Sequence, residues 1–268
     1  MKFLRDEPLK KIKPKMAMAA SYRAVMSGSG IAGMQREDVV ATIVRLTGKK
    51  EAKDITCLYI GTAIYNDQRG AAQYLGLETA GCSITHLSMD ATKADAEVLF
   101  LADVILVSGG NTLFAVDRWQ HLDIQHLFAE AGLRGAVLCG GSAGAICWFD
   151  SGHSDSGDPT SFRVVNPNLT EEGKASWEYI RVDGLGVFPG LMCPHYDQTQ
   201  SNGVLRATDF SEMMQCHPGE RGLGLDHFCA LVTEGDGSYS VLSCPGKEGS
   251  AYVNYLLNVV LCFLFLLL

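Results

Sequence analysis

The sequence has little positive charge and lacks the cysteine patterns that bind metal ions. It holds 22 lysine and arginine residues against 30 aspartate and glutamate residues, a formal net charge of -8. No basic stripe occurs beyond the first fifteen residues, so the electrostatic pattern of a nucleic-acid-binding protein is missing. The nine cysteines form no C-x-x-C pair, and no cysteine and histidine have the spacing of a zinc site. We therefore expect no nucleic-acid partner, no metal ion and no cofactor.

The chain also lacks a secretion signal and an apolar run long enough for a membrane-spanning helix. Residues 1–15 are basic without the apolar stretch of a signal peptide, and we interpret residues 1–21 as a basic, poorly ordered tail. Residues 255–268 are almost wholly apolar but fall short of the roughly 20 residues that a membrane-spanning helix needs. For the tail at 254–268 three interpretations stay open: a short anchor, a folded terminal element, and an artefact such as a shifted reading frame. The unpaired cysteines and the missing signal predict a cytoplasmic protein.

Residues 22–253 have the composition and the pattern of a single α/β domain. With 47% hydrophobic residues, the chain can bury a large core. Up to about residue 148, short strand-like runs alternate with helical stretches, which predicts a mostly parallel central sheet flanked by helices on both faces. The predicted strands are 23–27, 55–61, 83–88, 103–108 and 136–140, and the predicted helices are 36–47, 67–80, 93–101 and 112–131. After a polar stretch at 150–161, further strand-like runs follow near 185–194, 223–232 and 239–243.

One serine lies in a G-x-S-x-G pattern directly after a predicted strand. The run is Ala136-Val137-Leu138-Cys139-Gly140-Gly141-Ser142-Ala143-Gly144-Ala145. In this pattern the turn between a buried strand and the following helix exposes the serine hydroxyl, and the glycines allow the tight backbone. The helix N-terminus supplies N–H groups that stabilise negative charge on a bound carbonyl. Ser142 is therefore the candidate nucleophile, and a glycine-rich turn with a bystander serine is the alternative.

A nucleophilic serine needs a histidine within hydrogen-bond reach and an acid that orients this histidine. Among seven histidines, His195 stands out because it ends the apolar run 186–194. His153 competes because it lies close to the serine in the sequence, and we interpret the other histidines as structural. Spacing does not choose among the available acids, which are Asp150, Asp155, Asp158 and Asp197.

A second glycine turn, Ser108-Gly109-Gly110-Asn111-Thr112, follows the predicted strand at 103–108. The carboxyl ends of parallel strands share one edge of the sheet, so this turn is expected beside the serine. A backbone N–H of the turn and the N–H of Ala143 would then form an oxyanion hole, in which the loss of one donor costs roughly 3 kcal/mol in the transition state. A plain strand-to-helix turn capped by Asn111 or Thr112 is the alternative.

Three motifs occur in a fixed order along the chain: the turn at 108–112, the elbow at 140–145, and Pro194-His195-Tyr196. In this order and at these separations they resemble the peptidase E family of aspartyl dipeptidases, which are serine peptidases related to the cyanophycinases. The resemblance covers roughly residues 22–253. It implies the class I glutamine amidotransferase-like (flavodoxin-like) fold and the removal of an N-terminal aspartate from small peptides through an acyl-enzyme.

The resemblance also implies which residues form the catalytic triad. Ser142 corresponds to the nucleophile and His195 to the general base. The family's acid lies in the loop after the elbow helix, where this chain offers Asp155 first and Asp158 second.

The remaining implied residues would bind the substrate. The oxyanion donors are the N–H groups of Ala143 and Gly110, with Gly109 as a further option. Arg206 is the candidate for binding the aspartate side chain of the substrate, because a guanidinium grips a carboxylate through two hydrogen bonds. An exposed helical arginine is the alternative interpretation of Arg206.

Other functions stay open on the sequence alone. A glutamine amidotransferase carries cysteine where Ser142 stands, and Cys139 lies on the wrong side of the turn to replace it. A cyanophycinase-like or other amide hydrolase on the same fold is closer, and a non-catalytic relative is a further alternative. From another class, Gly28-Ser29-Gly30-Ile31-Ala32-Gly33 matches the G-x-G-x-x-G of dinucleotide-binding modules. The expected partner is a small peptide; a homodimer is left open, and a membrane is expected only if the tail is an anchor.

Overall fold

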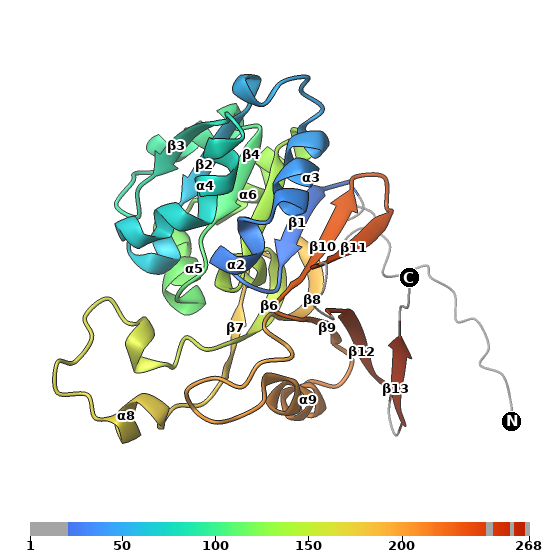
Figure 1. The fold of residues 1–268 in the computed structure, drawn as a ribbon. Coiled ribbons are helices and arrows are strands. Elements are labelled where there is room, and N and C mark those ends of the chain that lie inside the picture. The colour runs from blue at the N-terminus through green and yellow to red at the C-terminus, as the bar shows by residue number, and fades with distance from the viewer. Residues whose placement is uncertain (1–20, 245–248, 258–259, 266–268) are drawn as a thin grey trace, which may run out of the picture.

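The computed structural model describes residues 21–244, 249–257 and 260–265, and two β-sheets organise it (Figure 1). The strands of the first sheet are β1 (Arg23–Ser27), β2 (Thr56–Ile60), β3 (Ser83–Leu87), β4 (Val104–Val107), β5 (Val137–Gly141), β10 (Cys229–Glu234) and β11 (Tyr239–Ser243). They lie in the order β11-β10-β1-β5-β4-β2-β3. Strands β1, β5, β4, β2 and β3 run parallel, whereas β10 and β11 are antiparallel at one edge.

The connections between these strands are mostly helical. The α-helices are α2 (Ile31–Met34), α3 (Glu37–Thr47), α4 (Ala71–Thr79), α5 (Thr112–His121), α6 (Gln125–Leu133), α7 (Ala143–Ile146), α8 (Glu171–Ala175) and α9 (Arg206–Cys216). The predicted helix at 112–131 is two helices, because the chain turns between them and Asp123 has a φ of 54°. The predicted helix at 93–101 is a 3-10 helix over Asp95–Leu101.

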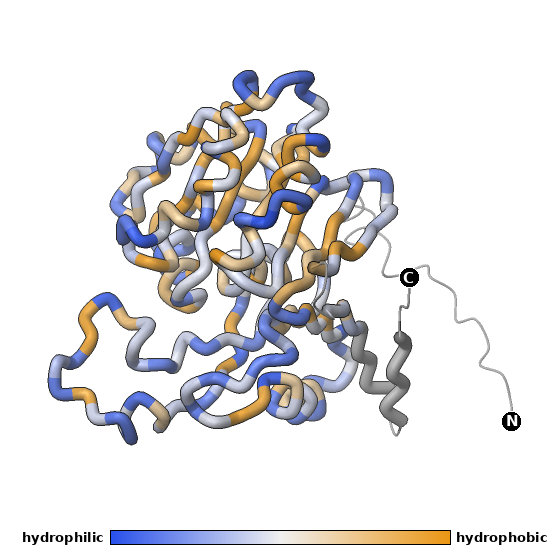
Figure 2. The backbone as a smooth tube through the Cα atoms, in the orientation of Figure 1, coloured by the Kyte–Doolittle hydropathy of each residue, from blue (hydrophilic) through white to orange (hydrophobic). Residues whose placement is uncertain are grey.

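Helices cover both faces of the first sheet because its central strands are apolar on both sides. All residues of β4 are buried, and alternate residues of a strand point to opposite faces. Val104 and Leu106 belong to the core formed with α3 and α4, whereas Ile105 and Val107 belong to the core formed with α5 and α6. Figure 2 shows hydrophobic backbone gathered in this sheet and its covering helices. The predicted α/β fold with a mostly parallel central sheet is confirmed.

The second sheet packs against the first and was not expected from the sequence. Its strands are β6 (Phe149–Ser154), β7 (Ile180–Asp183), β8 (Phe188–Cys193), β9 (Arg221–Leu225), β12 (Ala251–Leu257) and β13 (Val260–Phe265), in the order β13-β12-β9-β8-β6-β7. Strands β6, β8 and β9 are parallel. Phe149, Phe188 and Leu225 join the core that contains Ile105, so this core is shared by the two sheets.

Two sequence predictions are corrected by the second sheet. The polar stretch predicted at 150–161 begins inside β6, whose residues are polar but mostly buried. The run 223–232 is not one strand but the end of β9 and the start of β10, which belong to different sheets. The chain crosses between the sheets at 226–228. The residues on either side of this crossing, Leu225 and Cys229, are both fully buried in the shared core, which holds the crossing in place.

The two ends of the chain differ in what the structure describes. The predicted basic tail at residues 1–21 lies, except for its last residue, outside the described residues. In the predicted apolar tail at 254–268, the described residues belong to β12 and β13, an antiparallel pair at the edge of the second sheet. Within the described ranges, no helix has both the length and the hydrophobicity to cross a membrane.

Candidate active site

Ser142 stands at the sharp turn between β5 and α7. Its φ of 55° and ψ of -124° are rare for an L-residue, and this strained backbone is typical of a nucleophile elbow. Packing explains the flanking glycines: a Cβ at Gly140 would lie 2.3 Å from the carbonyl oxygen of Gly144, and one at Gly144 would lie 2.1 Å from that of Val107. The N–H of Ser142 donates to the Ser27 carbonyl at 3.2 Å. The G-x-S-x-G segment therefore forms the strand-turn-helix geometry that its sequence predicts.

His195 follows β8 of the second sheet and faces Ser142 of the first. Its Nε2 lies 2.9 Å from the Ser142 Oγ, and its backbone N–H donates to the Gly28 carbonyl at 2.9 Å. Burial, together with the positive charge of Arg206, holds the pKa of His195 well below its usual range. The imidazole is therefore neutral near pH 7 and can accept the proton of the serine hydroxyl.

The second ring nitrogen of His195 contacts another histidine, which the sequence analysis interpreted as structural. His195 Nδ1 and His227 Nδ1 lie 2.8 Å apart. His227 lies where the chain crosses from β9 to β10, and its backbone N–H donates to Asp197 Oδ1 at 2.8 Å. The available sequence signal was the position of His227 two residues after the run 222–225, just beyond the carboxyl end of a strand.

Asp155 lies beside the site but bonds to Arg206. Arg206 Nη1 donates to Asp155 Oδ2 at 3.2 Å, and Arg206 Nη2 donates to the His153 carbonyl at 2.6 Å. Burial opposes the ionisation of Asp155, yet the charges of Arg206 and His195 and the hydrogen bonds to the carboxylate together lower the pKa of Asp155. The negative charge of Asp155 in turn favours the protonated form of His195.

This placement bears on the substrate-binding role predicted for Arg206. The side chain of Arg206 is 0% exposed, and its guanidinium is used by Asp155 and by His153. The alternative of an exposed helical arginine is wrong, since burial is complete. The contacts of Arg206 indicate that it fixes Asp155, while binding of a substrate carboxylate stays a prediction.

The other candidate base and acids have partners elsewhere. His153 is buried in β6, and its Nε2 contacts Asp209 Oδ1 at 2.7 Å, so it is not brought to Ser142. Asp158 accepts the N–H of Thr160 at 2.8 Å at the start of a 3-10 helix. Asp150 accepts the N–H of Gly190 at 3.2 Å, and Asp197 holds the backbone of His227.

The glycine turn after β4 reaches the serine. A Cβ at Gly109 would lie 3.4 Å from the Ser142 Cβ, so the two turns are in close contact. The N–H of Gly109 donates to Gln73 Oε1 at 2.7 Å, which occupies this donor. Gly110 has a φ of 131°, and a Cβ there would lie 2.4 Å from the Ala63 carbonyl oxygen, so only glycine fits.

Because the N–H of Gly109 is bonded to Gln73, the N–H groups of Gly110 and Ala143 stay the predicted oxyanion donors. Ala143 is the first residue of α7, and the first N–H groups of a helix have no partner within the helix. Gln73, on α4, was not found from the sequence, because a glutamine on a helix carries no local signal of such a contact.

The G-x-G-x-x-G segment at 28–33 serves the protein's own packing. The N–H of Gly28 donates to the Cys229 carbonyl, and a Cβ at Gly28 would lie 2.0 Å from the Asp226 carbonyl oxygen. A Cβ at Gly33 would lie 1.8 Å from Ser27 Oγ. These close contacts explain Gly28 and Gly33 without a dinucleotide, and the Gly28 carbonyl accepts the backbone N–H of His195.

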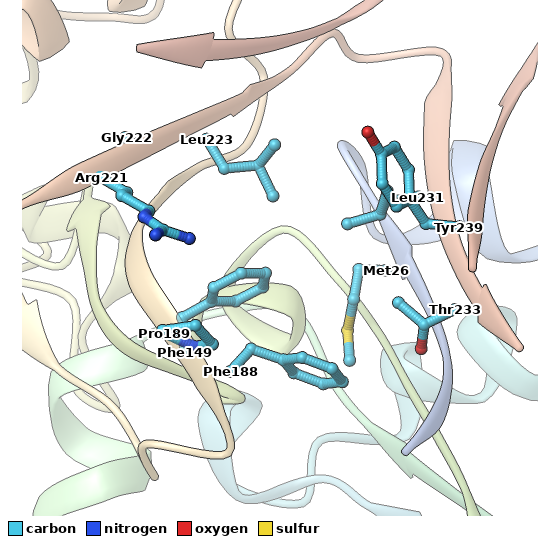
Figure 3. Close-up of a pocket in the computed structure, with 10 residues that line it drawn as sticks. All are labelled: Met26, Phe149, Phe188, Pro189, Arg221, Gly222, Leu223, Leu231, Thr233 and Tyr239. Atoms are coloured by element: carbon cyan, nitrogen blue, oxygen red, sulfur yellow. The ribbon is translucent and has the colours of Figure 1, made fainter. Parts of the chain in front are cut away.

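Two cavities differ in their relation to the serine. One of about 420 Å³ is lined by Gly110 and by Tyr65, Arg69 and Arg163, so it adjoins one of the predicted oxyanion donors. The other, of about 290 Å³, lies between the two sheets, where apolar side chains such as Met26, Phe188 and Leu223 line it (Figure 3). The lining of the second cavity contains none of the predicted site residues. The first cavity is therefore the better candidate for a substrate pocket.

Two known proteins are similar to this chain in sequence. The chain is 30% identical over 244 residues to a Trypanosoma brucei brucei protein named G2/mitotic-specific cyclin-1, covering 79% of this chain and 72% of that one. It is 36% identical over 126 residues to the uncharacterized peptidase YgaJ of Bacillus subtilis (strain 168), covering 46% of each chain.

Solved structures share the fold. A putative peptidase E protein from Listeria monocytogenes EGD-e superposes with a TM-score of 0.58 at 16% identity, covering 83% of this chain and 98% of that one. A peptidase from an acI-B1 Actinobacterium has a TM-score of 0.58 at 17% identity, covering 91% and 94%. The family model of peptidase family S51 matches residues 24–241. The resemblance to the peptidase E family is thus confirmed: the chain belongs to peptidase family S51 and is a serine peptidase.

Proposed function

We propose that this serine peptidase hydrolyses small peptides with an N-terminal aspartate, through Ser142 and His195. The observation that carries the proposal is the 2.9 Å contact between Ser142 Oγ and His195 Nε2 at a strained elbow. The pair is the minimal unit of nucleophilic catalysis by serine, because the hydroxyl needs a base within hydrogen-bond reach.

The reaction follows from the positions of these groups. His195 Nε2 accepts the hydroxyl proton while Ser142 Oγ bonds to the main-chain carbonyl carbon of the N-terminal aspartate. The carbonyl oxygen becomes an oxyanion, and the N–H groups of Ala143 and Gly110 donate to it, each donor contributing roughly 3 kcal/mol to the transition state. Protonated His195 then donates its proton to the leaving amine. Water, deprotonated by His195, then bonds to the acyl carbon, the bond from this carbon to Ser142 Oγ breaks, and His195 returns the proton to Ser142 as aspartate leaves.

Asp155 is proposed as the acid of the site. Its charge favours the protonated form of His195, which is the form that the transition state creates. Arg206 fixes the carboxylate of Asp155 through a hydrogen bond at 3.2 Å, while its own positive charge opposes the protonation of His195. In this proposal Asp155 acts on His195 through its charge, because its carboxylate bonds to Arg206.

Selectivity for an aspartate side chain requires a cation near the oxyanion hole. The cavity that begins at Gly110 is lined by Arg69 and Arg163. Arg69 already forms a two-bond contact with Asp67, whereas Arg163 has no carboxylate partner among the described residues. We propose Arg163 as the group that binds the substrate carboxylate, since a guanidinium matches a carboxylate in shape and charge.

Hydrolysis of Asp-Leu, Leu-Leu and N-acetyl-Asp-Leu by the wild type and by Ser142→Ala tests the proposal. We expect rapid cleavage of Asp-Leu alone and loss of nearly all of it in Ser142→Ala. Wild-type activity in Ser142→Ala would overturn the mechanism. Equal cleavage of Leu-Leu and Asp-Leu would overturn the specificity and leave a general amide hydrolase, such as a cyanophycinase-like enzyme. The name of the trypanosomal relative describes that protein, and the Ser142–His195 contact supports a hydrolase here.

A further inference from the structure

We infer that His227 is a positioning residue that holds His195 in the one tautomer able to accept the serine proton. The inference deepens the proposed function and rests on its Ser142–His195 step. Its basis is the 2.8 Å contact between the two Nδ1 atoms, with the ring centroids 4.9 Å apart and the ring planes tilted by 43°.

The contact fixes where the protons lie. To accept the hydroxyl proton of Ser142, His195 Nε2 must carry a lone pair, so the proton of a neutral His195 is on Nδ1. That Nδ1–H points to His227 Nδ1, which must accept it. His227 therefore carries its own proton on Nε2 and is also neutral.

The surroundings of His227 hold it rigidly in this position. Its N–H donates to Asp197 Oδ1 at 2.8 Å, and its carbonyl accepts the Ser29 hydroxyl at 2.7 Å. Its ring packs edge-on against Phe228, with centroids 4.6 Å apart. The segment lies between β9 and β10, so both of its ends are anchored in sheets. A group that is fixed in this way can orient another ring.

The arrangement divides between two residues the tasks of a single triad acid. Asp155 supplies negative charge but bonds to Arg206, whereas His227 supplies the hydrogen-bond acceptor at Nδ1 without charge. Protonation of His227 would reverse the inner bond, because its Nδ1 would become a donor. His195 would then carry its proton on Nε2 and could not accept one from Ser142.

The acid limb of the pH profile should therefore depend on His227. The ionisable groups near the pair act on it from several elements. Asp155 and Arg206 act on His195 through their charges. Asp197 accepts the backbone N–H of His227, and Asp226 precedes His227 in the sequence. Arg36 donates to the carbonyl of Phe228, the residue that follows His227.

The experiment compares His227→Phe, which keeps a ring but removes the acceptor, with His227→Gln, whose side-chain oxygen can still accept. We expect His227→Phe to lower kcat roughly 100-fold and to leave KM nearly unchanged. This decrease in kcat is smaller than the roughly 10⁴-fold decrease that follows when a charged orienting group is neutralised. His227→Gln should recover most of this loss and shift the acid limb of kcat/KM. Exposed His126→Phe is the matched control and should leave kcat unchanged.

A second readout does not depend on the peptide. The rate at which a fluorophosphonate reagent labels Ser142 should fall in His227→Phe and recover in His227→Gln, with thermal unfolding confirming that both variants are folded. Wild-type kcat and labelling in His227→Phe would overturn the inference, as would equal losses in the Phe and Gln variants. Labelling that persists in Ser142→Ala would instead overturn the proposed function.

Discussion

Ser142 and His195 lie 2.9 Å apart although each has a positive φ, 55° for the serine and 50° for the histidine. The two residues follow strands of different sheets, β5 and β8, so the contact forms only where the sheets pack together. A positive φ is unfavourable for both residue types and persists only when the surroundings impose it. Ser27 bonds the backbone of the serine and Gly28 that of the histidine, so one turn after β1 holds both.

Gln73 is expected to stabilise the oxyanion turn. In Gln73→Leu the buried N–H of Gly109 loses its acceptor, which costs about 1–3 kcal/mol and frees the turn to move. We expect a roughly tenfold lower kcat and a lower urea midpoint, while Gln73→Glu keeps the acceptor oxygen and most of the activity. Gln120→Leu, at an exposed position of α5, is the control. An unchanged kcat in Gln73→Leu would contradict the role.

The sequence predicts the nucleophile and the base but not their neighbours. Ser142 is predictable because strand, turn and helix are adjacent in the chain, and His195 because it ends an apolar strand. His227 is 32 residues from His195 and was hidden inside a run that resembles one strand but joins two sheets. The placement of Arg206 depends on how α9 packs against β6, and no local pattern encodes that packing.

Asp155 and Asp158 are separated by replacing each with asparagine. Asp155→Asn leaves the fully buried Arg206 without its counter-charge, which we expect to cost about 3 kcal/mol and to lower kcat roughly tenfold. Asp158→Asn should change little, because asparagine caps a helix as well as aspartate. Urea unfolding and initial rates on Asp-Leu provide both quantities. A larger loss of kcat in Asp158→Asn would assign the acid to Asp158 instead.

Buried His153 predicts a loss of stability in mild acid. Burial lowers the pKa of His153 to about 4, and the positive charge of Arg206, whose Nε donates to His153 Nδ1, lowers it further, while the bond to Asp209 opposes both effects. The unfolded chain binds this proton near pH 6.5, so the free energy of unfolding rises with pH between about 4 and 6.5. From pH 7 to pH 5 this group contributes a loss of about 2 kcal/mol.

Urea titrations at pH 7 and pH 5 measure this contribution. In the wild type, the free energy of unfolding decreases from pH 7 to pH 5. This decrease should be about 2 kcal/mol smaller in His153→Phe, whatever the stability of that variant at pH 7. It should stay at the wild-type value in His121→Phe, which replaces an exposed histidine at the end of α5. The same decrease in His153→Phe as in the wild type would show that His153 is not the titrating group.

Arg163 should determine selectivity for the acidic side chain. In Arg163→Gln the cavity beside Gly110 keeps a polar side chain at this position but loses the cation that has no carboxylate partner among the described residues. We expect KM for Asp-Leu to rise roughly 10- to 100-fold, the loss of about 1.5–3 kcal/mol that a hydrogen bond to a charged group contributes, with kcat nearly unchanged. Arg163→Lys should recover less than half of the binding, because an ammonium lacks the two-bond geometry.

Arg69→Gln removes an arginine of the same cavity that is already paired with Asp67, so its KM should stay within about threefold of the wild type. A rise in KM for Asp-Leu in Arg69→Gln but not in Arg163→Gln would transfer the role to Arg69.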